Sequence, residues 1–289
     1  MFHTMYNFAT LFLILPFVRQ VAALMLRLVP LKESDAIDTT YDKKLMYMDT
    51  KVPQGPSLAI SNARLELCRI QKIANETLTL SLEAFFEASL DKAKRVLRNE
   101  KVIDALTRKT SDKLVKINNM TLPQGYAKRV GKMIRVLYDL ERIGDHAENI
   151  AEYTINVSEN ELTFTDAAMS ELKRLGAVVT DVANKSLETL EKRDTDLLVH
   201  VKTLEKTVGN LTSAFTENHI NRLQNESCEP RSGVVFTDML IDLERSAKHA
   251  RNVATKLMPK RKRSNSVKST LPRFFRGRRS TVEVETEEN

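Results

Sequence analysis

The sequence is poor in residues that interrupt helices. It has eight Gly, eight Pro and no Trp among 289 residues, whereas Leu, Lys, Glu and Ala, which keep most of their side-chain freedom in a helix, are abundant. Hydrophobic residues make up 42% and charged residues 29% of the chain, which is ordinary for a globular protein. We therefore expect an all-α protein.

Cysteine is also scarce. Cys68 and Cys228 are the only two, which is too few for a disulfide framework or for a zinc site built on paired thiolates. Neither lies in a motif that would activate a thiol. We expect both to be small buried side chains in a reducing compartment.

The motifs of several catalytic classes are missing. There is no Gly-rich phosphate loop, no Gly-x-Ser-x-Gly and no His or Cys ligand cluster, so nucleotide hydrolysis and nucleophilic catalysis have no visible apparatus. A di-metal carboxylate enzyme needs Glu three residues before His, whereas His146 and His249 follow Glu141 and Glu244 by five. We expect these histidines to be satisfied polar groups at a helix interface. The protein is predicted not to be an enzyme, with a di-metal carboxylate enzyme as the less favoured alternative.

One long apolar run opens the sequence. Between residues 4 and 31 only Arg19 and Arg27 are charged, and a helix of that length, about 42 Å, would cross a bilayer. Only His3 precedes the run and several lysines follow it, so the positive-inside rule places the rest of the chain in the cytosol. We predict a single transmembrane helix over 1–31 in the inner cell membrane. A signal peptide and a surface helix are the alternatives.

The net positive charge is concentrated at the other end. Residues 256–279 contain ten Lys or Arg and no acid, which is more than the formal net charge of +7 of the whole chain. We predict that residues 259–289 form a disordered tail, basic and then acidic. Its cations and the pair Phe274 and Phe275 suit anionic lipid as well as nucleic acid. With a membrane helix at the other end, nucleic acid is the less favoured partner.

Apolar residues recur every three and four positions after a linker at 32–56, which is the spacing of one helical face. The stripes begin near residue 57 and then cover about 91–118, 123–156, 166–192, 194–224 and 231–257. In the third stripe the small residues Gly144, Ala147 and Ala151 would let a neighbouring helix approach closely. Six helices are expected.

The two halves of this region repeat. DLERIGDHAENIA at 139–151 matches DLERSAKHARNVA at 242–254 in eight of thirteen positions. The simplest architecture is therefore two tandem three-helix bundles, at 57–158 and 165–258, behind the membrane helix.

These strings resemble known families. DLERIGDHAENIAE, the doubled three-helix layout, and HINRL followed by 228–236 resemble PhoU domains, over roughly 57–257. The run from His3 to Asn7, leading into an apolar segment with Pro16, resembles the entry to the last transmembrane helix of sodium/phosphate cotransporters, in which a PhoU domain follows the transport domain.

The resemblance implies a cytosolic regulatory module of a sodium-dependent phosphate cotransporter, acting in phosphate transport and phosphate homeostasis or signalling. Its implied partners are the membrane, the cotransporter's transport domain, phosphate or metal ions, and a second copy of the chain in a homodimer. Most of the transport domain is missing, so we expect a fragment or a split-gene product. A free-standing, membrane-tethered, metal-binding PhoU-like regulator is the alternative.

Two pairs of acids stand four residues apart on predicted helices. Glu100 and Asp104 share one face, and Glu141 and Asp145 share another. Like charges at this spacing destabilise a helix by a few tenths of a kcal/mol, which a cation bound between neighbouring helices would reverse. On spacing alone, solvated surface acids are the favoured interpretation.

Here too the resemblance adds an expectation, because some PhoU domains hold multinuclear metal clusters with such pairs. It implies that Glu100, Asp104, Glu141 and Asp145 bind a divalent or multinuclear metal, whether iron, magnesium, calcium, manganese or zinc.

The second repeat departs from this pattern. The partners of Glu205 and Glu244 are Gly209 and Lys248, so we predict one metal site, in the first repeat only. In the second, Lys248 would pair with Glu244 and take the place of the metal's charge.

Overall fold

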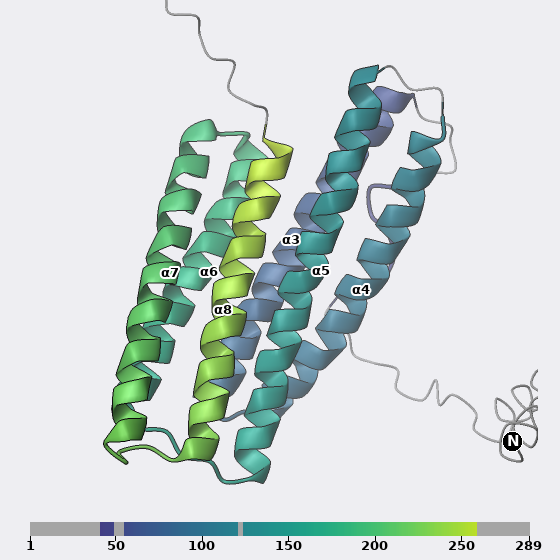
Figure 1. Cartoon of the computed structure of the whole chain (residues 1–289). Coiled ribbons are helices and arrows are strands. Elements are labelled where there is room, and N and C mark those ends of the chain that lie inside the picture. The colour runs from purple at the N-terminus through teal and green to yellow at the C-terminus, as the bar shows by residue number, and fades with distance from the viewer. Residues whose placement is uncertain (1–40, 49–54, 121–123, 259–289) are drawn as a thin grey trace, which may run out of the picture. The chain divides into compact units, whose positions relative to one another are not determined.

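The computed structural model describes residues 41–48, 55–120 and 124–258, in which six helices are joined by short connections (Figure 1). They are α3 (Pro56–Phe86), α4 (Leu90–Asn118), α5 (Gln124–Glu159), α6 (Asp166–Lys192), α7 (Thr195–Gln224) and α8 (Pro230–Leu257). The expected all-α, six-helix fold is confirmed, and each helix lies close to its predicted stretch.

Local sequence fixes where the helices begin. At the N-caps of α4, α6 and α7 a side-chain oxygen accepts a hydrogen bond from a backbone N–H of the first turn, and the capping residues are Ser89, Thr165 and Asp194. Helices α3 and α8 begin instead with Pro56 and Pro230. Proline is tolerated there because the N–H it lacks has no partner within a helix.

The helices pack as two groups of three. Helices α3, α4 and α5 contact one another and form the first bundle, and α6, α7 and α8 form the second. The bundles are joined along α5 and α8, which lie side by side in Figure 1, and along α3 and α6. As expected, Ala147 and Ala151 are fully buried, and a Cβ on Gly144 would lie 3.3 Å from Ile103 of α4.

Part of the predicted linker packs against the first bundle. Residues 41–48, here called the strap, form no helix, but Leu45 is buried in the core. The backbone N–H groups of Met46 and Tyr47 donate to Oε2 of Glu66, at 2.9 and 2.8 Å. Glu66 is fully buried on α3, so its carboxylate anchors the strap. Periodicity could not predict this, since the strap has none.

The predicted membrane helix at 1–31 and the predicted tail at 259–289 lie outside the described residues. Among the helices that are described, none combines the length and apolar character needed to cross a membrane.

Candidate functional site

The four predicted metal ligands influence one another across the contact between α4 and α5. Burial and then the negative charges of Glu148, Asp104 and Asp145 together raise the pKa of Glu100 to about 7. The pKa of Glu141 is also raised, by burial and then by Asp145 and Asp104. The two acidic pairs therefore form one electrostatic group.

A further carboxylate belongs to this group. Glu148 stands three residues after Asp145 on α5, and its pKa is raised by burial and then by Glu152 and Asp145. Its i+3 spacing from Asp145 was a signal that could have identified it, but a search for pairs four residues apart passes over it.

Two arginines partly balance the cluster. Nη1 of Arg142 lies 3.0 Å from Oδ2 of Asp145, and Nη2 of Arg108 lies 3.7 Å from Oδ2 of Asp104. In the part of the chain that the structure describes, no three His, Cys, Asp or Glu side chains lie close enough together to hold a metal ion as they stand. Carboxylate oxygens are nevertheless the donors that hard divalent cations prefer.

The second bundle places cations where the first has acids. Nζ of Lys248 lies 2.8 Å from Oε1 of Glu244, so the predicted pairing is confirmed. Lys248 stands at the repeat position of Asp145.

At the repeat position of Glu148 the second bundle likewise has a cation, Arg251, in place of the acid. Its Nε lies 3.8 Å from Oε1 of Glu205, across the contact between α7 and α8. Glu205 occupies the repeat position of Glu100. The second bundle therefore has an ion pair where the first has two acids, Glu100 and Glu148.

The repeated motif also joins the bundles. Asp242 of α8 is buried, and its Oδ1 lies 2.8 Å from Nδ1 of His146 on α5. The hydroxyl of Tyr153 donates to Oδ2 of the same carboxylate at 2.7 Å, and Nδ2 of Asn149 donates to both oxygens at 3.3 Å. A carboxylate accepts only, so three side chains of α5 hold one acid of α8.

The reverse contact uses the same repeat positions. Asp139 of α5 is buried, and its Oδ1 lies 3.0 Å from Nδ1 of His249 and 3.3 Å from Nδ2 of Asn252. Lys256 takes the place of Tyr153 and donates to Oδ2 of Asp139. We call these two reciprocal contacts the clasp. The expectation that both histidines lie at a helix interface is confirmed, but sequence reasoning did not identify their aspartate partners.

The PhoU domain model matches residues 67–154 and 172–257. The chain belongs to the PhoU domain family. The two matches fall on α3 to α5 and on α6 to α8, so each bundle carries one PhoU repeat.

Several PhoU proteins are similar to this chain. A phosphate-specific transport system accessory protein PhoU homolog 1 from Thermotoga maritima is 24% identical over 189 residues, which are 64% of this chain and 80% of that protein. A phosphate-specific transport system accessory protein PhoU homolog from Zymomonas mobilis is 23% identical over 217 residues, which are 72% of this chain and 90% of that protein.

Two crystal structures share the fold. PhoU from Pseudomonas aeruginosa has a TM-score of 0.64 at 21% identity and covers 68% of this chain and 94% of its own. The phosphate transport system regulatory protein PhoU from Streptococcus pneumoniae has a TM-score of 0.62 at 17% identity, with 70% and 95% covered. The sodium/phosphate cotransporter context stays a prediction.

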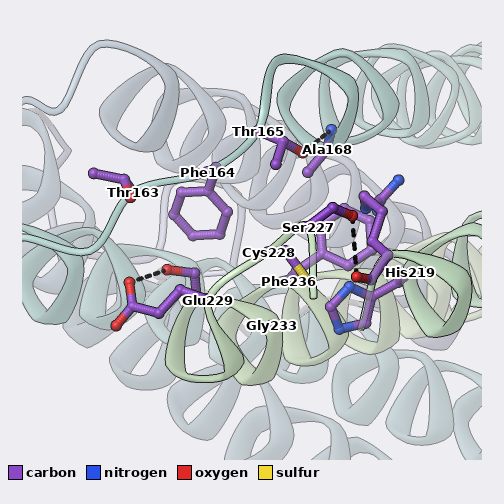
Figure 2. Close-up of a pocket in the computed structure, with 12 residues that line it drawn as sticks. Thr163, Phe164, Thr165, Ala168, His219, Ser227, Cys228, Glu229, Gly233 and Phe236 are labelled. Carbon is purple, nitrogen blue, oxygen red and sulfur yellow. Dashed lines mark hydrogen bonds between the residues drawn. The ribbon is translucent and has the colours of Figure 1, made fainter. Parts of the chain in front are cut away.

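A small pocket lies where the PhoU-like segments HINRL and 228–236 meet, at one end of the second bundle (Figure 2). Its volume is about 180 Å³. The ring of His219 on α7 lies against Gly233 of α8, and burial followed by the charge of Arg222 lowers the pKa of His219. The guanidinium of Arg222 stacks over Phe236, 5.0 Å from the ring centre. These contacts hold α7 against α8.

Proposed function

We propose that this chain is a PhoU-type regulator of phosphate uptake and phosphate signalling, and that it is a binding protein, not an enzyme. The proposal is supported by the PhoU match of both bundles. It is also supported by relatives that are named as accessory proteins of phosphate-specific transport systems.

We propose further that the first bundle binds a divalent or multinuclear metal through Glu100, Asp104, Glu141 and Asp145. The observation that carries this step is the exchange of charge between the repeats. The second bundle pairs Lys248 with Glu244, the repeat counterpart of Glu141. The first bundle keeps acids whose pKa values are raised by burial and then by the neighbouring negative charges. A bound cation would remove that repulsion.

The membrane context is a separate part of the proposal. The resemblance of residues 3–16 to a cotransporter helix supports a regulatory module tethered by residues 1–31 to the cytosolic side of the inner membrane, next to a sodium/phosphate transport domain. The relatives, which are named as accessory proteins of phosphate-specific transport systems, favour the second candidate, a free-standing PhoU regulator. A helical transport gene immediately upstream would support the first candidate, and its absence the second.

Equivalent acids in the two bundles provide the test of the metal site. In purified full-length protein loaded with Fe²⁺ or Mn²⁺, Glu141→Ala should lower the bound metal, measured by elemental analysis, at least tenfold. Glu244→Ala should leave it unchanged, because Glu244 is already paired with Lys248. In cells, Glu141→Ala should also alter the rate of radioactive phosphate uptake.

A natural protein that takes up no metal would contradict the metal site, and so would equal losses in the two variants. Phosphate uptake that is unchanged when the whole gene is deleted would contradict the regulatory role, whatever the metal content.

A further inference from the structure

Four lysines meet where the strap contacts the C-terminal part of α4. They line a pocket of about 260 Å³, whose lining residues are Lys44, Leu45, Lys109, Asp112, Lys113 and Lys116. We call it the lysine pocket. Asp112 is its only acid, so the lining carries a clear excess of positive charge.

Within the described region, the ammonium groups of these lysines are not neutralised by acids, although the backbone N–H of Lys44 donates to Oδ1 of Asp42 at 2.9 Å. Among the described residues, none of the four forms an ion pair with an acid, whereas Lys185 and Lys192 on α6 share Glu188 at 2.8 and 2.6 Å. Like charges held together without a counter-charge repel one another. An anion that enters the pocket would therefore relieve this repulsion and lower the free energy.

The strap holds its side of the pocket in place. Nη2 of Arg69 donates to the backbone carbonyl of Lys44 at 2.7 Å, and Nε of Arg69 pairs with buried Glu66 at 2.8 Å. Nζ of Lys109 donates to the backbone carbonyl of Lys43 at 2.8 Å. The backbone of Lys44 is thus held in place before any ligand arrives, which lowers the entropy lost on binding.

We propose that the lysine pocket binds clustered phosphate groups. A lysine ammonium is a compact charge with three donors and a common partner of phosphate oxygens, and a cleft lined by one sign of charge concentrates ions of the opposite sign. The C-terminal end of α4 lies here, and its carbonyls disfavour an anion. The lysines therefore supply the attraction, and a ligand with several charges fits them better than one phosphate.

Two sources offer this chemistry, a dissolved oligophosphate and the phosphate headgroups of an anionic membrane. The site uses none of the carboxylates of the proposed metal centre. A negative result for phosphate binding at the lysine pocket would therefore leave the proposed function untouched, and a negative result for the proposed function would leave the pocket untouched.

The test is a footprint of lysine reactivity on the full chain. Residues 256–279 carry ten Lys or Arg and no acid and would also attract anions, so only a residue-resolved measurement separates the two regions. The protein is treated with an amine-acetylating reagent at low salt, alone, with tripolyphosphate, and with phosphatidylcholine vesicles with and without phosphatidylglycerol. Mass spectrometry then gives a rate for each lysine. Lys113 and Lys116 should react at least threefold more slowly with one probe, while exposed Lys202 and Lys206 of α7 should not change.

Paired charge reversals make the test specific. Lys113→Glu with Lys116→Glu should abolish the protection of Lys44, and Lys202→Glu with Lys206→Glu should preserve it at the same net charge. Protection by tripolyphosphate would assign a free oligophosphate, and protection by anionic vesicles alone would assign lipid headgroups. If neither probe protects the natural chain, or Lys44 stays protected in the first variant, the proposal is overturned.

Discussion

Single residues set the opposite electrostatic character of the two bundles. Glu100 faces the charge of Glu148 in the first bundle, whereas its repeat counterpart Glu205 faces Arg251 in the second. An acid whose folded pKa is raised binds more protons when folded than when unfolded, so its effect on stability changes with pH. The pKa of Glu100 rises from 4.5 to about 7. Stability should therefore fall as pH increases through this interval.

Glu100→Gln removes this charge and should reverse the loss. In the presence of a chelator, we expect the variant to be more stable than the natural chain at pH 8, by up to about 1 kcal/mol because solvent screens a half-buried group, and little changed at pH 4.5. Urea unfolding at the two pH values measures the difference. Glu205→Gln is the matched control and should be neutral or destabilising, since Glu205 lies near Arg251. A similar gain in both variants would contradict the assignment.

Some of this could be predicted from the sequence. The i and i+4 spacing of Glu244 and Lys248 is local, and the predicted ion pair is present. The part that Glu148 plays depends on the neighbouring helix α4, through Glu100. Spacing along one helix cannot reveal a charge on the next.

At the scale of helices, close approach depends on residues without side chains. A Cβ on Gly233 would lie 2.8 Å from Cε1 and 2.9 Å from Nε2 of His219, whose ring packs against α8. Contacts below 3.0 Å require one side to move, and an imidazole ring is rigid. The spacing between α7 and α8 therefore depends on Gly233.

Gly233→Ala should destabilise the protein by about 1–3 kcal/mol, because the ring of His219 must leave its position. Gly131→Ala on α5 should do the opposite and stabilise by about 0.5–1 kcal/mol, since its new methyl would meet only Arg135 at 3.9 Å. The free energy of unfolding in urea gives both values. A Gly233→Ala protein as stable as the natural chain would show that α7 and α8 have room to spare.

The elements themselves were predicted well where the signal is local. Apolar residues three and four apart predicted every helix. The N-cap residues Ser89 and Thr165 are local signals too, but the prediction did not use them. The packing of the strap could not be predicted, because its anchor, Glu66, lies about twenty residues away and belongs to a residue type that is normally exposed.

At the scale of the whole described region, the clasp couples the two PhoU repeats. Burial raises the pKa of Asp242, but hydrogen bonds from His146 and Tyr153 outweigh it, and the pKa lies below its ordinary value. Asp139 has the same balance, with His249 and Lys256 as the stronger contributors. The repeat was visible in the sequence. The reciprocal contact was not, because His146 and Asp242 are separated by 96 positions.

The clasp should therefore contribute stability that depends on pH with a definite sign. A folded pKa below the ordinary value of 3.8 gives stability that is present above that pH and lost as the pH falls through the folded pKa. Asp242→Asn should destabilise by about 2–4 kcal/mol at pH 7, and the difference should shrink as the pH falls below 3.8. Asp238→Asn, one turn earlier on α8, is the control and should be neutral or stabilising, because burial and Asp242 raise the pKa of Asp238.

A double-mutant cycle then tests whether the contact itself is responsible. His146→Ala and Asp242→Asn should show a coupling of about 0.5–3 kcal/mol in urea unfolding at pH 7, because the two side chains share a buried hydrogen bond. Asp238→Asn with His146→Ala should be additive. Additive losses in the first pair would mean that α5 and α8 are held by their apolar contacts alone, and the clasp would then have no energetic part in joining the repeats.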